Sequence, residues 1–218
     1  MDIAHSIIAF DLDDTLYSER EQYAAQCLHH VAQRLGLDAA TERAMVHSRN
    51  PYDTLTQAGV DVSIDRFKEL YRSTELQPMQ LRPDAAKLLQ KLRTDYPEVS
   101  LYLITDGDSR RQRAKIAALG LQDYFADTHI IISEEIGHDK HSPMPFIHAM
   151  ARENRAEGWV YVGDNIRKDF HHPNRLGWTT IMLADDGSNV HPQTVDVDAD
   201  FRPQFTIKSL TEILCQQL

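Results

Sequence analysis

Short runs of consecutive apolar residues, separated by longer segments of helical periodicity, constrain the fold of this chain most. An apolar run without alternation is typical of a parallel strand covered on both faces, because both side-chain directions are then buried. The runs are Ile7–Phe10, Leu101–Ile104, Ile130–Ile132, Trp159–Val162 and Thr179–Leu183, with Phe205–Ile207 as a weaker candidate. They predict a mostly parallel sheet built from strands that are far apart in the sequence.

Helical patterns fill most of the segments between these runs. The segment 82–96 carries Pro83 near its start and apolar residues at helical spacing. The segment 108–120 begins with an Asp-Ser capping pair and ends at a glycine. The segments 142–155 and 209–218 have the same character. This alternation of strands and helices predicts a doubly wound α/β fold.

One stretch interrupts the alternation because it contains no convincing strand. Helical patterns cover residues 19–37, 41–60 and 63–73, the second broken by an Asn-Pro pair and a glycine. An insert after the first strand leaves the sheet at its carboxyl edge, where ligands bind in this fold class, and is typical of a lid. The predicted division is a core of residues 1–17 and 81–218 and an inserted helical cap of residues 18–80.

The charge balance limits the classes of partner. The 218-residue chain has 42% hydrophobic and 26% charged residues and a formal net charge of -10 at pH 7. An acidic chain argues against a broad nucleic-acid footprint, which needs a basic surface. It does not exclude an anionic substrate, because local cations and a metal outweigh the global sign.

Cysteine usage and the N-terminus indicate the compartment. The two cysteines, Cys27 and Cys215, are too few for a disulfide framework or a zinc spacing. The first residues lack the regions of a secretory signal, and no apolar run approaches the roughly 18 residues of a membrane span. We therefore expect a cytoplasmic protein with reduced thiols and no membrane partner, as a monomer or a homodimer.

Three carboxylates follow the first apolar run, in the segment Phe10–Leu16, which reads FDLDDTL. In an extended chain the side chains of Asp11 and Asp13 point to the same side, just beyond the strand end. Unpaired carboxylates are costly there, and paired oxygen ligands favour Mg²⁺. An acidic cap of a following helix would explain the same residues, so the motif alone leaves both interpretations open.

The next two strand ends carry groups suited to an anion. Thr105, Asp106 and Gly107 precede a helix, so a hydroxyl and free backbone N–H groups there form an anion pocket. Lys140 follows the third run, where its ammonium reaches a phosphate oxygen or a carboxylate. An ordinary strand-to-helix turn and a surface lysine are the alternatives for these two features.

The fourth run ends in Gly163-Asp164, and Asp169 follows five residues later. Glycine allows close backbone approach, and Asp164 falls at the carboxyl edge of the sheet, either as a metal ligand or in a capping turn. Singly these signals are weak. Together, successive strand ends carry paired Asp, Thr, Lys and Gly-Asp, an order that indicates phosphoryl or acyl-carboxylate chemistry.

In these motifs the sequence resembles the haloacid dehalogenase-like (HAD) hydrolase superfamily, and the resemblance covers nearly the whole chain. It implies a Rossmann-like core with a helical cap between the first and second motifs. The residues that carry it are Asp11–Leu16 for the first motif, DxDxT, Thr105 for the second, Lys140 with Pro143 and Phe146 for the third, and Gly163, Asp164 and Asp169 for the fourth.

The resemblance implies a mechanism centred on the first motif. Asp11 would be the nucleophile that attacks phosphorus and forms an aspartyl-phosphate. Asp13 would protonate the leaving alcohol and then activate the hydrolytic water. Asp11, the backbone carbonyl of Asp13 and Asp164 would hold Mg²⁺, which lets an anionic nucleophile approach an anionic phosphate.

The same resemblance implies supporting roles for the later motifs. Thr105, with the turn at Asp106 and Gly107, would bind the phosphoryl group. Lys140 would neutralise that group and hold the nucleophile in position. Asp169 would lie behind the residues that contact the phosphoryl group and the metal, as a partner of Lys140 or of metal-bound water.

Asp13 distinguishes the branches of the superfamily. Its dehalogenases lack an acid at the equivalent position, since a halide leaves without a proton, whereas an alkoxide needs one. The sequence therefore predicts a phosphatase acting on a small phosphorylated metabolite, such as a sugar phosphate, phosphoglycolate or a nucleoside monophosphate. A phosphomutase, which keeps this acid, and a low-activity binding protein on the same scaffold are the alternatives.

Two positions depart from the family pattern: Asp106 stands where Asn is common, and His141 where Pro usually follows the lysine. The added carboxylate would either repel substrate or turn away and orient a loop. The basic run 110–113 is interpreted as the solvated face of a helix. Adjacent histidine pairs diverge on a helix, so we expect no transition-metal site from them. Tyr17 and Arg20 lie at the hinge into the cap. The candidate substrate-contacting groups of the cap are among His47, Arg49, Asn50 and Tyr52.

Overall fold

The computed structural model describes residues 3–154 and 157–214, and within them the strands form one parallel sheet. Its order is β3-β2-β1-β4-β5-β6. The strands are β1 (Ile7–Phe10), β2 (Ser100–Thr105), β3 (Ile130–Ile132), β4 (Trp159–Gly163), β5 (Thr179–Leu183) and β6 (Phe205–Ile207). The predicted doubly wound sheet is confirmed, and every predicted apolar run is a strand.

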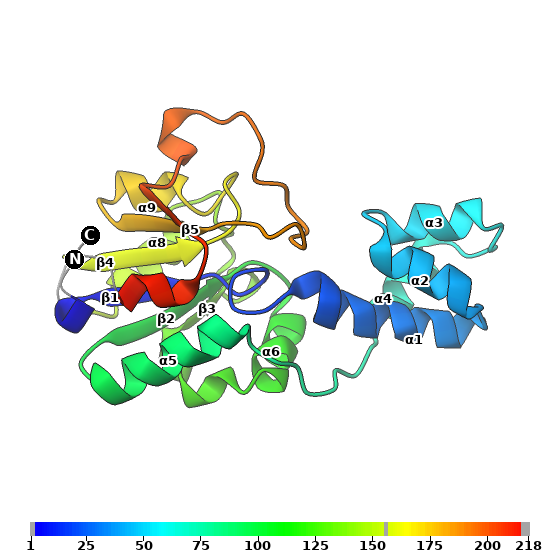
Figure 1. The fold of residues 1–218 in the computed structure, drawn as a ribbon, viewed down its shortest axis with the longest axis horizontal. Coiled ribbons are helices and arrows are strands. Elements are labelled where there is room, and N and C mark those ends of the chain that lie inside the picture. Colours follow the sequence, from blue (N-terminus) through cyan, green and yellow to red (C-terminus); the bar gives the residue numbers. More distant parts are fainter. Residues whose placement is uncertain (1–2, 155–156, 215–218) are drawn as a thin grey trace.

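Strand β1 lies in the interior of the sheet, where Ile7 pairs with Ser100 of β2 and with Trp159 of β4. The chain passes outward from β1 to β2 and β3, then returns to the other side of β1 for β4, β5 and β6 (Figure 1). The direction of winding therefore reverses between β1 and β4. In open parallel sheets, ligands bind beyond the carboxyl ends of the strands at such a reversal.

Helices cover both faces of the sheet. Ile8 and Phe10 of β1 pack into one hydrophobic layer, and Ile7 and Ala9 pack into the other. Both faces of this strand are buried, which explains its unbroken apolar sequence. The layers are formed by α5 (Pro83–Asp95) and α6 (Ser109–Ala118) on one face, and by α8 (Met144–Met150) and α9 (His171–Arg175) on the other (Figure 1).

The helical block between β1 and α5 lies beyond the carboxyl edge of the sheet (Figure 1). It contains a small core of its own, formed by Leu28, Val31, Met45, Leu55 and Leu70 among others. Its elements are a π-helix (Glu19–Ala24), α1 (Ala25–Leu35), α2 (Ala39–His47), α3 (Pro51–Gln57) and α4 (Ile64–Arg72). The predicted helical insertion is confirmed.

Two glutamines join the chain segments that enter and leave this block. The side chain of Gln22 donates to the carbonyl of Gln80 at 2.7 Å and accepts from its N–H at 2.6 Å. Gln26 makes the same pair of hydrogen bonds with the backbone of Gln77, at 3.4 and 2.8 Å. The segment that enters the insert and the segment that leaves it are therefore tied to each other.

One helical prediction was too long, and another differs in the type of helix. The helix expected over 142–155 is α8, which ends at Met150, and the last of those residues lies outside the described part of the chain. The helix expected over 209–218 is a 3-10 helix over Leu210–Leu214, and the remainder also lies outside the described residues, including Cys215. Cys27 is buried and free.

Among the residues that the structure describes, no helix is long and apolar enough to span a bilayer.

The remaining short elements connect the layers. The connecting elements are the helix α7 (Ser133–Ile136) and the 3-10 turns Ile3–His5, Leu121–Asp123, Asp127–His129 and Ala199–Phe201.

Candidate active site

The carboxyl ends of β1, β2 and β4 bring three of the predicted site residues to one place. Asp11 directly follows β1, and its backbone N–H donates to the carbonyl of Val162 in β4 at 2.8 Å. Thr105 is the last residue of β2, and Asp164 directly follows β4. Three residues after Asp11 the chain turns at Asp14, whose φ of 57° lies in the left-handed region. Adjacency of these strands, rather than of their sequences, creates the site.

Lys140 reaches this place from the loop after α7. Its side chain is fully buried, and its ammonium donates to the carboxylates of Asp11 and Asp169, the latter at 2.8 Å. A buried ammonium is stable only when it is paired and hydrogen-bonded. The loop position therefore holds a charged group aimed into the site and not a solvated surface lysine.

Three buried carboxylates, those of Asp11, Asp164 and Asp169, each place an oxygen within 4.8 Å of the others. Asp169 also accepts hydrogen bonds from the backbone N–H groups of Asp164, at 3.2 Å, and Asn165, at 2.8 Å. Carboxylate oxygens are the ligands that Mg²⁺ prefers. Among the described residues, this is the one cluster of possible metal ligands, and it contains no histidine.

The electrostatics of the cluster also fit a divalent cation. Burial raises the pKa of Asp11 to about 7, although the nearby Lys140 opposes this shift. Burial and the charge of Asp11 raise the pKa of Asp164 well above its usual value. Both shifts mean that one lysine is too little positive charge for three close carboxylates. A bound cation would supply the missing charge.

Gly163 has a specific steric reason to be glycine. A Cβ built at this position would lie 2.6 Å from the carboxylate oxygen Oδ2 of Asp169, far inside contact distance. The absent side chain lets Asp169 fold back against the start of the loop after β4. The Gly-Asp motif therefore shapes the carboxylate cluster through packing as well as through the carboxylate of Asp164.

Asp13 faces a different set of partners from those of Asp11. Its carboxylate accepts from Lys115 at 2.8 Å and from Gln112 at 3.1 Å, and it also accepts from the Tyr17 hydroxyl. Burial disfavours the charged form, but the charge and hydrogen bond of Lys115, together with the hydrogen bonds of Tyr17 and Gln112, outweigh burial and hold the pKa of Asp13 below its usual value. The side chain of Asp13 does not belong to the three-carboxylate cluster.

The residues of the predicted anion pocket are occupied by protein partners. The Thr105 hydroxyl accepts from the Gln112 amide, and the Gly107 N–H donates to the Ser133 hydroxyl at 2.8 Å. Asp106 accepts from the Lys140 backbone N–H at 3.1 Å and from the Lys168 ammonium at 2.9 Å. Of the two alternatives for this added carboxylate, the contacts match a residue that orients the loop carrying Lys140.

The interpretation of residues 110–113 as a solvated face is wrong in part. Gln112 is buried and touches Thr105 and Asp13, and Arg111 lies over the rings of Tyr23 and Tyr71. Arg110, which is exposed, and Arg113, which has surface partners, follow the prediction. The prediction that this whole run faces solvent was wrong, because one side of the helix is buried at Gln112.

Sequence reasoning also missed Lys115, which is buried between Asp13 and Glu19. A signal was present, because Gln112 and Lys115 share a helical face with the apolar Ile116 and Leu119. No such signal marks Asn189, whose amide donates to the Asp164 carboxylate at 2.8 Å from a loop after β5.

A buried aspartate centre at the winding reversal of a parallel α/β core, beneath a helical insert, defines the class of this protein. The family described as haloacid dehalogenase-like hydrolase matches residues 8–183. The chain belongs to this family.

Curated relatives are phosphatases by name. A glyceraldehyde 3-phosphate phosphatase of Methanopyrus kandleri is 28% identical over 196 residues, covering 81% of this chain and 82% of its own. An N-acylneuraminate-9-phosphatase of Mus musculus is 39% identical over 146 residues, covering 66% of this chain and 54% of its own. A ribulose-1,5-bisphosphate 5-phosphatase of Halopiger xanaduensis is 27% identical over 203 residues, covering 81% of this chain and 83% of its own.

Solved structures share the whole fold at low sequence identity. A magnesium-bound chain from Bacillus subtilis, assigned to the HAD hydrolases, has a TM-score of 0.72 at 18% identity and covers 96% of this chain and 97% of its own. A predicted phosphoglycolate phosphatase of Haemophilus somnus has a TM-score of 0.68 at 19% identity, with 99% of both chains covered. At this identity the likeness shows the fold alone.

Proposed function

We propose that this chain is a magnesium-dependent phosphomonoester hydrolase that acts on small phosphorylated metabolites through an aspartyl-phosphate on Asp11. The observation that carries the proposal is the contact of Asp11 with the buried Lys140, inside a cluster completed by Asp164 and Asp169. The phosphatase names of the relatives support the same reaction class.

In the proposed first step, a carboxylate oxygen of Asp11 attacks phosphorus while the bond between phosphorus and the alcohol oxygen breaks. Asp13 transfers its proton to that oxygen, so the alcohol leaves neutral. In the second step, water attacks phosphorus and gives a proton to Asp13, and the bond between Asp11 and phosphorus breaks. Inorganic phosphate leaves, and both aspartates return to their starting states.

The contacts of Asp13 favour its proposed role as a base, in the second step, over its proposed role as an acid, in the first. Lys115 favours the charged form, which is the form that accepts a proton from water. The first step needs the protonated form. The approach of a dianionic phosphate favours that form, because a like charge nearby raises the pKa of a carboxyl. We assign Lys115, Tyr17 and Gln112 as positioning residues that aim Asp13.

The remaining motif residues bind and orient. Lys140 would neutralise the transferring phosphoryl group and hold the Asp11 carboxylate in place, and Thr105 would donate its hydroxyl to a phosphoryl oxygen. Asp106 acts through Lys140 and Lys168. When bound by Asp11, Asp164 and the Asp13 carbonyl, Mg²⁺ supplies the charge that lets phosphate approach these carboxylates.

We further propose that residues 18–80 form the cap and that residues 1–17 and 81–218 form the catalytic core. The cap stands over the carboxyl edge of the sheet, where it would exclude water and select the leaving group. The cytoplasmic location and the monomeric or homodimeric state stay predictions from the sequence.

The test is hydrolysis of p-nitrophenyl phosphate with Mg²⁺, with EDTA, and by Asp11→Asn. We expect turnover by the wild type with Mg²⁺. The value of kcat/KM should fall by more than about 10³-fold with EDTA or in the variant, because catalytic groups that work together are each needed for the full rate. Asp61→Asn, which removes an equal charge from an exposed cap position, is the matched control and should retain activity.

The same panel separates the alternative functions. A wild type that hydrolyses no phosphate ester would favour the binding protein on a HAD scaffold. Production of an isomeric sugar phosphate, dependent on added bisphosphate, would favour the mutase. Activity that survives Asp11→Asn would contradict the aspartyl-phosphate mechanism itself.

A further inference from the structure

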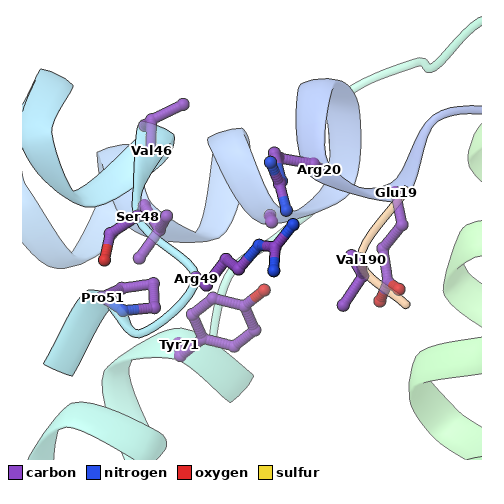
Figure 2. A pocket seen from close by; sticks show the side chains of 10 residues that line it. Glu19, Arg20, Val46, Ser48, Arg49, Pro51, Tyr71 and Val190 are labelled. Atoms are coloured by element: carbon purple, nitrogen blue, oxygen red, sulfur yellow. The ribbon is translucent and has the colours of Figure 1, made fainter. Parts of the chain in front are cut away.

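A cavity of about 170 Å³ lies between the insert and the core, and its walls come from both. Arg20 and Glu19 enter it from the π-helix, and Arg49 enters from the connection between α2 and α3 (Figure 2). Tyr71 of α4 and Val190 of the loop after β5 complete these walls. Val190 is the lining residue that comes from the core, so the cavity lies mainly in the insert, on the side that faces the core.

Two arginines of this cavity form no ion pair within the described residues, although the charge of Arg20 partly offsets the rise that burial causes in the pKa of the nearby Asp14, whose carboxylate accepts from backbone N–H groups. Figure 2 shows the guanidinium groups of Arg20 and Arg49 pointing into the same space. Within the described residues, Arg20 has one long hydrogen bond, at 3.5 Å to the carbonyl of Asn189, and neither guanidinium forms an ion pair. Two guanidinium groups that share a cavity repel each other unless an anion lies between them.

The one carboxylate of the lining does not fill this role. Glu19 accepts from the ammonium of Lys115 at 3.3 Å, on the side of the core. Burial, reinforced by the charge of Asp13, raises the pKa of Glu19 to about 7, so it carries less than a full charge near neutral pH. The positive charge of the two arginines therefore stays available to a ligand.

The cavity shares a wall with the catalytic carboxylates. Asn189 donates its amide to Asp164 at 2.8 Å, and the backbone N–H of Val190 donates to the Asp14 carboxylate at 2.7 Å. Val190 lines the cavity itself. Glu19, which also lines the cavity, contacts Lys115, and Lys115 contacts Asp13, so a second chain of contacts joins the cavity to the site.

We propose that Arg20 and Arg49 form a second anion subsite, and that the preferred substrates are phosphate monoesters carrying a further carboxylate or phosphate. This inference rests on the proposed phosphatase function and names its substrate class. The phosphate undergoing transfer lies at Asp11, and the second anion lies between the two guanidinium groups, which bind such planar or tetrahedral oxyanions through paired N–H donors.

The test compares matched substrates that differ only in the second anion. One pair is 3-phosphoglycerate and glycerol 3-phosphate, which tests a carboxylate, and the other is fructose 1,6-bisphosphate and fructose 6-phosphate, which tests a second phosphate. For each pair the measured quantity is the ratio of kcat/KM, anionic over neutral. Wild type should favour the anionic member of at least one pair by about tenfold or more, because hydrogen bonds to charged groups are the strong ones.

The variants assign that preference to the arginines. Arg49→Gln and Arg20→Gln should each lower the ratio about tenfold, mainly through KM, and Arg49→Lys should keep part of it. Arg43→Gln removes the same charge from an exposed position of α2 that does not line the cavity, and it should leave the ratio unchanged.

Each outcome decides the inference. A wild-type ratio near one in both pairs, or a ratio that survives both glutamine variants, would overturn the subsite while p-nitrophenyl phosphate hydrolysis keeps the phosphatase proposal intact. An equal fall in Arg43→Gln would show that general charge, and not the cavity, sets the preference. A wild type that hydrolyses none of these esters would overturn both proposals.

Discussion

At the scale of single residues, the site is dominated by charges that are buried together. Lys140 is surrounded by the carboxylates of Asp11, Asp169 and Asp106, and the Asp106 contact runs through the lysine's own backbone. Such an arrangement fixes the position of each group, because moving any of them leaves another unpaired in a low-dielectric environment. The departure from the family pattern at Asp106 therefore has a structural role in this chain.

Asp106 gives a pH dependence whose sign is fixed by its partners. Burial opposes its charge, but Lys140 and Lys168 outweigh burial and hold the pKa of this carboxyl below 3.8. A carboxyl with a lowered pKa in the folded state adds stability above its unfolded pKa, and this stability is lost as pH falls through the folded value.

We therefore expect Asp106→Asn to lower the free energy of unfolding by about 1–3 kcal/mol at pH 6–7. The difference from wild type should shrink as pH falls below about 4, where Asp106 itself becomes neutral. Denaturant unfolding across this pH range measures both effects. Asp61→Asn, at an exposed position, should show no such trend. A difference that grows toward low pH would contradict the assignment.

At the scale of elements, α6 provides two side chains that contact the residues at or just after the ends of β1 and β2. Its first residue follows Asp108, whose carboxylate caps the helix by accepting from the N–H of Arg111 at 2.9 Å. One turn later Gln112 contacts Thr105, and Lys115 contacts Asp13. The position at which this helix starts therefore determines where Gln112 and Lys115 lie, and these two side chains orient Thr105 and Asp13.

Removal of this cap should affect stability and activity together. We expect Asp108→Ala to lower the free energy of unfolding by about 1 kcal/mol, the usual value of an N-cap, and to lower kcat as Gln112 and Lys115 lose their fixed positions. Denaturant unfolding, amide hydrogen exchange of α6 and kcat on p-nitrophenyl phosphate measure these effects.

Asp38 provides the matched control, because it caps α2 in the insert with a 2.7 Å bond to the N–H of Thr41. Asp38→Ala should cost a similar free energy while leaving the amide exchange of α6 unchanged. Faster exchange of α6 in this control, or unchanged exchange in Asp108→Ala, would show that the cap does not act locally.

At the scale of the whole molecule, metal binding and folding stability are linked. The carboxylates of Asp11, Asp164 and Asp169 come from segments that lie more than 150 residues apart in the chain, so the unfolded chain offers no comparable site. A ligand that binds only the folded state stabilises it by about 2.7 kcal/mol at one hundred times its Kd. For a chain of this size that corresponds to a rise in Tm of about 5–10 °C.

We expect Mg²⁺ to raise the Tm of the wild type by this amount and to have little effect on Asp164→Asn. Without metal, the variant should be at least as stable as the wild type, because it removes one of the mutually repelling carboxylates and its amide can still bond to Asn189. Differential scanning calorimetry with Mg²⁺ and with EDTA measures the Tm of the wild type and of the variant under both conditions. A full Mg²⁺ shift in the variant would place the cation elsewhere.

The strands and the motif residues could be predicted from the sequence because their signals are local. A strand buried on both faces must be apolar throughout, so Ile7–Phe10 and its counterparts were identified almost to the residue. Residues that follow such strands in a parallel sheet meet at one edge, which is why Asp11, Thr105 and Asp164 were predicted to be neighbours.

The packing of the whole chain was needed to show what the buried face of α6 contacts and which loops reach the site. Gln112 and Lys115 share a helical face with apolar residues, but their contacts with Asp13 depend on how α6 packs. Arg49 meets Arg20 because the connection between α2 and α3 packs beside the π-helix within the insert. The sequence by itself determined the strands, their carboxyl-edge residues and the chemistry that these can perform, because backbone periodicity encodes burial. The tertiary structure decided the partners of each charge, because a polar side chain is compatible with both water and a buried counter-charge, and only the surrounding fold selects between them.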